Sequence, residues 1–579
     1  MSRSASDLVV DVLVEAGITH LFGLPGGNTM ELWKALHGRE HQVRAIVPRD
    51  EQTASCMADI YGKLTGKPGV FSAQGVFAGS TGLFGVIESY LSHSPMVVLS
   101  EMSEVDGFLL HGPIQGGTGS YGSIDLAGIF RGTTKSVAVA HYPREAVTAT
   151  QLALKHAVAG CPGPTAVLYR SSAIKGQVPD GVYPEVHETA PYLAVEKTCP
   201  PPGALQKAAD LLARAQRPVI VAGNGVRIAR AFAELEQVAQ RLGAAVVTSY
   251  LGKSVIAETH PLAVGPIGYT GLPLANETLG NADVVLVVGC RLKPQETCFA
   301  SPRLLDPKRQ TIIQLDVEPR NASWTVPAQL ALAGDAQLSL QLLDEHLARV
   351  ADAAAARERT RALEALKEAR AVFSQPAARS AAVPLYPQRV VAELAEAVPE
   401  DAIVCTDAGN NRHWMNHFFR TKRANSYFGT GGIAGVSWSV AAALGAAILQ
   451  PQRPAIAVCG DGGLAMQIHV LLTAVQYGVK PVWVVLNNSA FGMTGQGMGE
   501  RSVGNDLPDT DYAKIARAFG CHAERVERPG QMREALAAAL RQDKPAVLDV
   551  VIDANQNMKR ELFSPWATEA LAAAATKTY

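Results

Sequence analysis

A short glycine turn carrying one carboxylate is the clearest chemical signal in the sequence. The apolar run Ala455–Cys459 leads directly into Gly460-Asp461-Gly462-Gly463. A β-branched run of this kind predicts a buried strand, and the glycines predict a tight turn at its carboxyl end. Strand ends are where α/β sheets bind ligands, so the turn predicts a site for a cation or an anion.

A second strand ends in amides at a matching distance along the chain. The run Val482–Leu486 is followed by Asn487-Asn488-Ser489-Ala490, one helix and one strand beyond Asp461. We therefore expect Asp461 and Asn488 on neighbouring loops. A carboxylate, an amide oxygen and a backbone carbonyl suit Mg²⁺, which keeps water or phosphate oxygens at its other positions. The glycine amides nearby can cradle a diphosphate.

A further acidic segment, Arg49-Asp50-Glu51-Gln52, precedes a helical pattern that runs through Ala54, Met57 and Tyr61. Acids are favoured at the start of a helix because they complement its dipole. The residues alone leave two interpretations open, a helix-start acid or an acid with a chemical role.

Composition limits the classes of protein. The chain has 579 residues, 47% of them apolar and 18% charged, with a net charge of −1. That balance is globular and offers no broad field for nucleic acid. The eight cysteines are never in CxxC spacing, and the N-terminus has no apolar export segment, so we predict reduced, mostly buried thiols in a cytoplasmic protein.

One long stretch without acidic or basic residues, 424–452, has the length of a membrane span. Its first half is rich in glycine and polar residues. The sequence therefore favours a glycine-rich loop leading into a buried helix, and no membrane partner.

Short β-branched runs alternate with helical segments, which predicts an α/β fold of three domains, each with a mostly parallel sheet flanked by helices. The predicted domains are 1–185, 195–345 and 385–560, and an exposed helix is expected over Ala351–Val372. The predicted strands are Gly69–Ser72, Met96–Ser100, Thr165–Tyr169, Pro218–Ala222, Ala245–Thr248, Val284–Val288, Ile312–Leu315, Ala402–Thr406, Ala455–Cys459, Val482–Leu486 and Ala546–Val551.

With its GDG turn followed at this spacing by Asn-Asn, the chain resembles the thiamine-diphosphate-dependent decarboxylase and carboligase superfamily. The resemblance implies a first domain that binds the aminopyrimidine, a middle domain that is structural or holds FAD or ADP, and a third that binds diphosphate and metal. It implies Mg²⁺ ligands at Asp461, Asn488 and the carbonyl of Ala490. The implied diphosphate contacts are Asn410, Asn411, Gly460, Gly462 and Gly463.

The resemblance also gives Glu51 a role. Members of the superfamily place a glutamate before an alanine-rich helix and a GKPGV segment, here Gly66–Val70. That glutamate hydrogen-bonds N1′ of the pyrimidine and helps the neighbouring nitrogen remove the thiazolium C2 proton. Glu51 is therefore the expected catalytic acid.

Within the superfamily, the chain is most similar to the acetolactate synthase group, because Phe22–Gly27 matches its FGxPGG turn. The likeness implies that Gly27 leaves room for a second substrate near the reactive carbon. It also places Val436 under the bent cofactor, the Ala434 carbonyl toward the 4′-amino group, and Met493 over the active site.

Two loops depart from the group's pattern. GPGATN is replaced by Gly75–Ser80, and the FQE stretch by Tyr121-Gly122-Ser123. Pyruvate and 2-oxobutyrate are therefore not assumed as substrates. The expected substrate pocket comprises Phe77, His111, Tyr121, Gly122, Arg412, His413 and Gln496.

Gly223-Asn224-Gly225, after an apolar strand, is only a partial dinucleotide fingerprint, because a third glycine and a following acid are missing. FAD in the middle domain stays open.

The sequence as a whole predicts an enzyme that uses thiamine diphosphate and Mg²⁺ to cleave or form a C–C bond of a 2-oxo acid or related carbonyl compound. We expect a homodimer or homotetramer with active sites between subunits. One alternative is a 2-hydroxyacyl-CoA or oxalyl-CoA lyase. Another is an inactive, cofactor-binding regulatory or structural relative, which retention of Glu51 disfavours.

Overall fold

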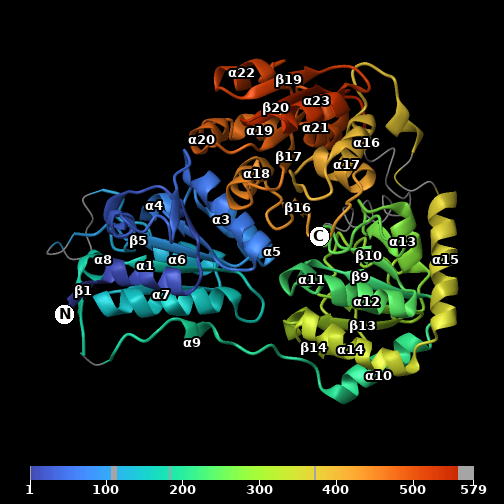
Figure 1. Ribbon diagram of the computed structural model, residues 1–579, viewed down its shortest axis with the longest axis horizontal. Coiled ribbons are helices and arrows are strands. Elements are labelled where there is room, and N and C mark those ends of the chain that lie inside the picture. The colour runs from blue at the N-terminus through green and yellow to red at the C-terminus, as the bar shows by residue number, and fades with distance from the viewer. Residues whose placement is uncertain are drawn as a thin grey trace. The chain divides into compact units, whose positions relative to one another are not determined.

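The computed structural model describes residues 2–105, 108, 114–181, 184–370, 373 and 375–557 (Figure 1). It contains three six-stranded sheets and one two-stranded sheet. In the six-stranded sheets every pair of neighbouring strands is parallel. The predicted fold class, three α/β domains with parallel sheets flanked by helices, is confirmed.

The first sheet has the order β3-β2-β4-β5-β7-β6. Its strands are β2 (His20–Gly23), β3 (Arg44–Ile46), β4 (Gly69–Ser72), β5 (Met96–Glu101), β6 (Ser136–Ala140) and β7 (Pro164–Tyr169). The helices of this part are α1 (Ala5–Glu15), α2 (Met30–Ala35), α3 (Glu51–Thr65), α4 (Gly75–Ala78), α5 (Leu83–Ser92), α6 (Leu126–Thr133), α7 (Pro143–Val158) and α8 (Ser171–Lys175). A two-stranded antiparallel sheet joins β1 (Ser2–Ser4) to β8 (Gln177–Pro179).

Alternate side chains of the first sheet face a core formed with α1 and α7. Val97, Leu99 and Val167 pack there against apolar side chains such as Val9 and Leu154. The helices supply these contacts because apolar residues recur on one side of each.

The middle sheet has the order β11-β10-β9-β12-β13-β14. Its strands are β9 (Pro218–Ala222), β10 (Ala245–Thr248), β11 (Ala263–Pro266), β12 (Val284–Val288), β13 (Thr311–Asp316) and β14 (Leu330–Ala333). The helices are α9 (Ala190–Leu193), which precedes this part, and α10 (Pro202–Ala213), α11 (Asn224–Ile228), α12 (Phe232–Leu242), α13 (Pro273–Gly280), α14 (Ala336–Val350) and α15 (Ala353–Ala369). The long yellow helix α15 is the predicted exposed helix, and it buries only Ala356 and Leu363 (Figure 1).

The third sheet has the order β16-β15-β17-β18-β20-β19. Its strands are β15 (Ile403–Thr406), β16 (Tyr427–Gly429), β17 (Ala455–Gly460), β18 (Val482–Asn487), β19 (His522–Val526) and β20 (Ala546–Val551). The helices are α16 (Pro387–Ala397), α17 (Asn410–Phe418), α18 (Trp438–Leu449), α19 (Asp461–Met466), α20 (Val470–Tyr477), α21 (Gly492–Met498), α22 (Tyr512–Ala518) and α23 (Gln531–Leu540). Short 3₁₀ helices lie at Gly27–Thr29, Pro319–Asn321, Pro376–Arg379 and Gly499–Arg501.

The chain divides into two compact units. The first unit comprises Met1–Glu196, Thr430–Gln452 and Met466–Val479, and the second comprises Lys197–Gly429, Arg453–Ala465 and Lys480–Tyr579. The first unit therefore contains the first sheet together with α18 and α20. The second unit contains the middle and third sheets. The predicted domain limits, 1–185, 195–345 and 385–560, stay predictions.

The segment without acidic or basic residues forms the short strand β16, which was not predicted, and then a glycine-rich loop and the buried helix α18, as predicted. Among the described residues, no helix is both long and apolar enough to cross a lipid bilayer. The eight cysteines carry no disulfide, and six of them are buried, whereas Cys199 is exposed.

Candidate functional site

The predicted metal residues meet at one edge of the third sheet, in the second unit. β17 and β18 are hydrogen-bonded neighbours, so the loops after them lie side by side. The backbone N–H of Ala490 donates to Asp461 Oδ2 at 3.2 Å, and that of Gly462 donates to Asp461 Oδ1 at 2.8 Å. The two loops predicted from the sequence are therefore in direct contact.

Asp461 is a buried carboxylate whose charge has no partner of opposite charge among the described residues. Its side chain is 3% exposed, and no ion pair among the described residues involves it. Burial raises the pKa of Asp461 above its usual value, because desolvation outweighs the backbone N–H groups that the carboxylate accepts. A divalent cation would relieve that penalty, so the residues present fit Mg²⁺.

Oxygen donors dominate this edge. Among the described residues, no group of three or more His, Cys, Asp and Glu side chains could hold a metal. A cation here would depend on the carboxylate of Asp461, the amide of Asn488 and the carbonyl of Ala490. Such a set suits a hard cation that keeps water or phosphate ligands.

The predicted diphosphate residues line the same edge. A Cβ on Gly460 would lie 3.3 Å from Asn411 Nδ2, and one on Gly492 would lie 2.8 Å from Asn488 Nδ2. Asn410 Nδ2 donates to Gln496 Oε1 at 3.1 Å. The loops after β15, β17 and β18 and the helix α21, which carries Met493, are thus gathered together. One local detail differs from the prediction: the helix begins at Asp461 itself, so Gly462 and Gly463 lie in its first turn.

Arg412 and His413 lie on α17, where Arg412 is half-buried and His413 is buried. The Arg412 guanidinium lies 5.0 Å from the centre of the Tyr250 ring, and His413 is 2% exposed. Burial and the nearby Arg412 hold the pKa of His413 well below its ordinary value. These contacts fit a packing role at least as well as a substrate contact.

Glu51 starts α3 in the first unit. Asp50 is the N-cap and accepts from the N–H of Thr53 at 2.8 Å, which leaves Glu51 in the first turn. Thr81 Oγ1 lies 3.2 Å from Glu51 Oε2 and 3.2 Å from the carbonyl oxygen of Phe77. The structure thus brings the predicted acid next to the loop that replaces GPGATN.

The same unit contains the glycine loop, here defined as residues 430–437. Gln52 Nε2 donates to Ser437 Oγ at 3.2 Å, so the residue after Glu51 contacts the loop that carries Ala434 and Val436. Ala434 and Ser437 have left-handed backbones, with φ of 54° and 80°. Non-glycine residues rarely adopt this conformation, which marks the loop as strained.

The surroundings of Gly27 are polar. A Cβ on Gly27 would lie 2.7 Å from Glu101 Oε1 and 3.2 Å from Gln74 Nε2, and its φ is 52°. Glu101 is buried at the end of β5. The sequence interpretation missed this residue, although it is the only charge in an otherwise uncharged strand.

The other predicted pocket residues are less well assembled. Tyr121 is 98% exposed and lies in a turn with Gly122, and nothing lies within 4 Å of a Cβ on Gly122. Among the described residues, no hydrogen bond or ion pair joins either of them to Glu51. His111 lies outside the described residues.

The structure gives Gly223 and Gly225, the glycine pair after β9, a packing role. A Cβ on Gly223 would lie 2.1 Å from Gly289 O, and one on Gly225 would lie 2.5 Å from Gly289 Cα. These glycines therefore permit close contact between the loops after β9 and β12, which explains them without a dinucleotide.

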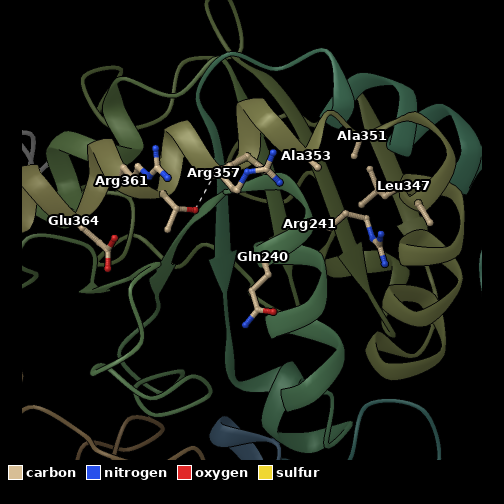
Figure 2. A pocket seen from close by; sticks show the side chains of 11 residues that line it. Gln240, Arg241, Leu347, Ala351, Ala353, Arg357, Arg361 and Glu364 are labelled. Carbon is tan, nitrogen blue, oxygen red and sulfur yellow. Dashed lines mark hydrogen bonds between the residues drawn. The ribbon is translucent and has the colours of Figure 1, made fainter.

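A surface cavity of about 540 Å³ lies between α12, α14 and α15 (Figure 2). Arg241, Arg357, Arg361 and Glu364 line it, and none of the predicted site residues does. This cavity is separate from the sheet edge that holds Asp461.

Comparison with known proteins identifies the class. The thiamine pyrophosphate enzyme models match in three parts: the N-terminal TPP-binding domain at residues 3–118, the central domain at 205–343 and the C-terminal TPP-binding domain at 407–550. The chain belongs to the thiamine pyrophosphate enzyme family.

Within that family, the chain is similar over nearly its whole length to acetolactate synthase large subunits. It is 30% identical to a probable acetolactate synthase large subunit of Methanocaldococcus jannaschii, over 95% of this chain and 92% of that protein. It is 27% identical to the acetolactate synthase isozyme 3 large subunit of Escherichia coli, over 96% of each chain. It is also 28% identical to a sulfoacetaldehyde acetyltransferase of Castellaniella defragrans, over 98% of this chain and 95% of that protein.

Proposed function

We propose that this protein uses thiamine diphosphate and Mg²⁺ to cleave or form a C–C bond next to a carbonyl, with a 2-oxo acid or a related compound as donor. The observation that carries the proposal is Asp461, a buried carboxylate that has no ion pair among the described residues and accepts the N–H of Ala490 on the next strand's loop. Family membership supports the cofactor, and the oxygen donors support the metal.

In this proposal the second unit anchors the cofactor. Asp461, Asn488 and the carbonyl of Ala490 would hold Mg²⁺, which neutralises a diphosphate. The surrounding contacts would come from Asn410, Asn411, Gly460, Gly462 and Gly463. When bound, thiamine diphosphate supplies a carbon nucleophile and an electron sink for the bond that is cleaved.

The first unit would supply the proton chemistry. Glu51 Oε2 accepts a hydrogen bond from Thr81, and a carboxylate has further lone pairs with which to hold a proton at N1′ of the pyrimidine. Ala434 and Val436, on the glycine loop, would contact the cofactor, and Gly27, Phe77, Met493 and Gln496 would face the substrate.

The donor and acceptor are part of the proposal only as a class. The relatives include acetolactate synthases and a sulfoacetaldehyde acetyltransferase. The glycine pair of the middle sheet gives no argument for FAD, because it already serves a loop contact, so the proposal does not depend on FAD. A homodimer or homotetramer that shares its sites between subunits, located in the cytoplasm, completes the proposal.

The test combines binding with product analysis. Thiamine diphosphate at about 100 times its dissociation constant stabilises a fold by roughly 2.7 kcal/mol, so a melting shift that requires Mg²⁺ is expected. The protein is then incubated with a panel of 2-oxo acids, with and without aldehydes and sulfoacetaldehyde, and products are identified by mass spectrometry. Absence of a Mg²⁺-dependent shift, or of any product, would contradict the proposal.

A further inference from the structure

Three charged side chains are buried together in the first unit. Asp59 and Lys63 lie one turn apart on α3, and Glu88 lies on α5. Lys63 Nζ pairs with Asp59 Oδ2 and lies 3.3 Å from Glu88 Oε1, and both carboxylates are fully buried. Burying charge costs free energy even when the charges are paired, so hydrophobic residues would often be as stable here.

Glu88 directs its carboxylate at the start of the glycine loop. Oε1 accepts from the N–H groups of Gly431 and Gly432, at 3.3 and 3.2 Å. Oε2 accepts from the N–H of Ile433 and from Thr430 Oγ1, both at 2.9 Å. Three consecutive backbone amides therefore point at one carboxylate.

Asp59 and Lys63 hold the other end of the loop. Trp438 Nε1, at the start of α18, donates to Asp59 Oδ2 at 2.9 Å. Lys63 Nζ lies 4.7 Å from the centre of the Trp438 ring, a cation–π contact. The charged triad, Asp59, Lys63 and Glu88, thus contacts both flanks of residues 434–437.

The loop between these contacts is strained. Left-handed non-glycine residues such as Ala434 and Ser437 persist only where the surroundings impose them. Gly432 and Gly435 allow the loop to fit closely, since a Cβ on them would lie 2.7 Å from Glu88 O and 2.1 Å from the Phe84 ring. The triad is the charged part of those surroundings.

We propose that the Asp59–Lys63–Glu88 triad is a positioning device, which holds the glycine loop in the strained shape that receives the aminopyrimidine of thiamine diphosphate. This inference rests on the proposed function. The three side chains act through the loop's backbone and through Trp438, and they do not touch the cofactor. A carboxylate suits the task because it accepts several donors at once, whereas an amide would turn N–H groups toward N–H groups.

The test compares two buried carboxylates of the same unit. Glu88→Gln removes the charge that faces the loop. Glu104→Gln is the matched control, because Glu104 is 3% exposed and accepts from Ser171 N and Arg170 Nε, remote from the loop in its contacts. Hydrogen–deuterium exchange at C2 of bound thiamine diphosphate is followed by proton NMR of acid-quenched samples, and Mg²⁺-dependent cofactor binding by calorimetry.

Glu88→Gln is expected to slow C2 exchange by at least about tenfold, because misplacing a reacting group by 1 Å can cost about 100-fold. Its cofactor affinity should stay within about threefold of wild type, since the metal site lies on other loops. Glu104→Gln should keep the wild-type exchange rate even where it lowers the melting temperature.

If Glu88→Gln does not fold, Thr430→Val tests the proposal instead, because it removes one hydrogen-bond donor to Glu88. It is expected to slow C2 exchange by about threefold. If Glu88→Gln or Thr430→Val folds and exchanges C2 at the wild-type rate, the proposal is overturned. It is also overturned if Glu104→Gln slows C2 exchange as much as Glu88→Gln does. Wild-type protein that exchanges C2 no faster than free cofactor would refute the proposed function instead.

Discussion

The first and third sheets have the same strand order but present different chemistry where their strands end. Counting β2 and β15 as strand one, β3-β2-β4-β5-β7-β6 and β16-β15-β17-β18-β20-β19 both read 2-1-3-4-6-5. In each sheet a carboxylate lies at the carboxyl edge, Glu101 at the end of the fourth strand of one and Asp461 after the third strand of the other.

The two carboxylates differ in the kind of donor that they meet. Glu101 accepts from Gly75 N at 3.2 Å, Ser103 Oγ at 2.8 Å and Asn28 Nδ2 at 3.4 Å, as well as from Ser103 N. Among the described residues, Asp461 meets backbone N–H groups alone. With the same topology, one carboxylate joins loops through side-chain and backbone donors, and the other is the one for which we propose a cation.

The largest expected effect separates proton chemistry from anchoring. Glu51→Gln should lower the rate of C2 exchange by about 10² to 10⁴, the usual contribution of a general acid–base group. Mg²⁺-dependent cofactor binding should persist, because the proposed metal ligands lie on the third sheet. NMR of acid-quenched samples measures the exchange. An unchanged rate would make Glu51 only a helix-start acid.

Each of the two units also contains a histidine whose pKa is lowered by burial. Desolvation lowers the pKa of His417 on α17 to about 4, and that of His20 on β2 to about 4. The unfolded chain binds protons below pH 6.5, so stability is present above that value and is lost as the pH falls from 6.5 to 4.

For His417 alone the loss should approach about 3 kcal/mol at pH 4. In the His417→Gln variant, the free energy of unfolding of the second unit should therefore depend less on pH. That of the first unit should keep its wild-type pH dependence. Chemical denaturation followed at several pH values gives both curves. A wild-type slope in the variant would contradict the burial argument.

Asp461→Asn should abolish the stabilisation of roughly 2.7 kcal/mol expected at about 100 times the dissociation constant, because the cation loses its charged ligand. Glu101→Gln is the counterpart at the other edge and should keep the Mg²⁺-dependent melting shift. Differential scanning fluorimetry with Mg²⁺ or EDTA measures both. Retention of the shift in Asp461→Asn would remove the metal assignment.

The smallest effect compares two glycines that follow strand one of each sheet. Gly27 and Gly409 both have positive φ, 52° and 86°. A Cβ on Gly27 meets Glu101 Oε1 at 2.7 Å, whereas one on Gly409 has only Asn411 Nδ2 at 3.8 Å.

Gly409→Ala should cost about 1 kcal/mol for its backbone, and Gly27→Ala about 2 kcal/mol or more, because crowding adds to strain. Unfolding in urea without ligand measures both. If both substitutions lower the free energy of unfolding equally, the Glu101 side chain can move aside at little cost, and the contrast between the two sheet edges is weakened.

The sequence predicts the interior of the sheets better than their borders. All eleven predicted strands are present, within about a residue at each end. The strands that went unpredicted include all six edges of the large sheets, β3, β6, β11, β14, β16 and β19. An edge strand such as β19, His-Ala-Glu-Arg-Val, is half exposed and lacks a continuous apolar run. The interior strand β2 was missed because it is short and holds His20 and Gly23.

The site was predictable where the pattern is local. The GDG turn and the Asn-Asn loop lie on adjacent strands as predicted. Glu88 and Glu101 were not predicted, because the loop amides that Glu88 accepts, and Gly75 and Asn28 beside Glu101, come from distant parts of the chain. The available signal was weak: each is a lone charge in an apolar element, which in a buried position requires hydrogen-bond partners.

The buried cysteines are distributed so that their alkylation can report local unfolding in each part of the chain. Cys56 lies in α3, Cys290 and Cys298 belong to the middle part, and Cys405 and Cys459 lie in the third sheet, all of them buried. Burial raises the pKa of each of Cys56, Cys290, Cys298 and Cys459, so alkylation must await local opening. Cys199 is exposed, so it would be alkylated without local opening and would give the reference rate. Mass-resolved alkylation would then report the order in which the three parts open, without any substitution.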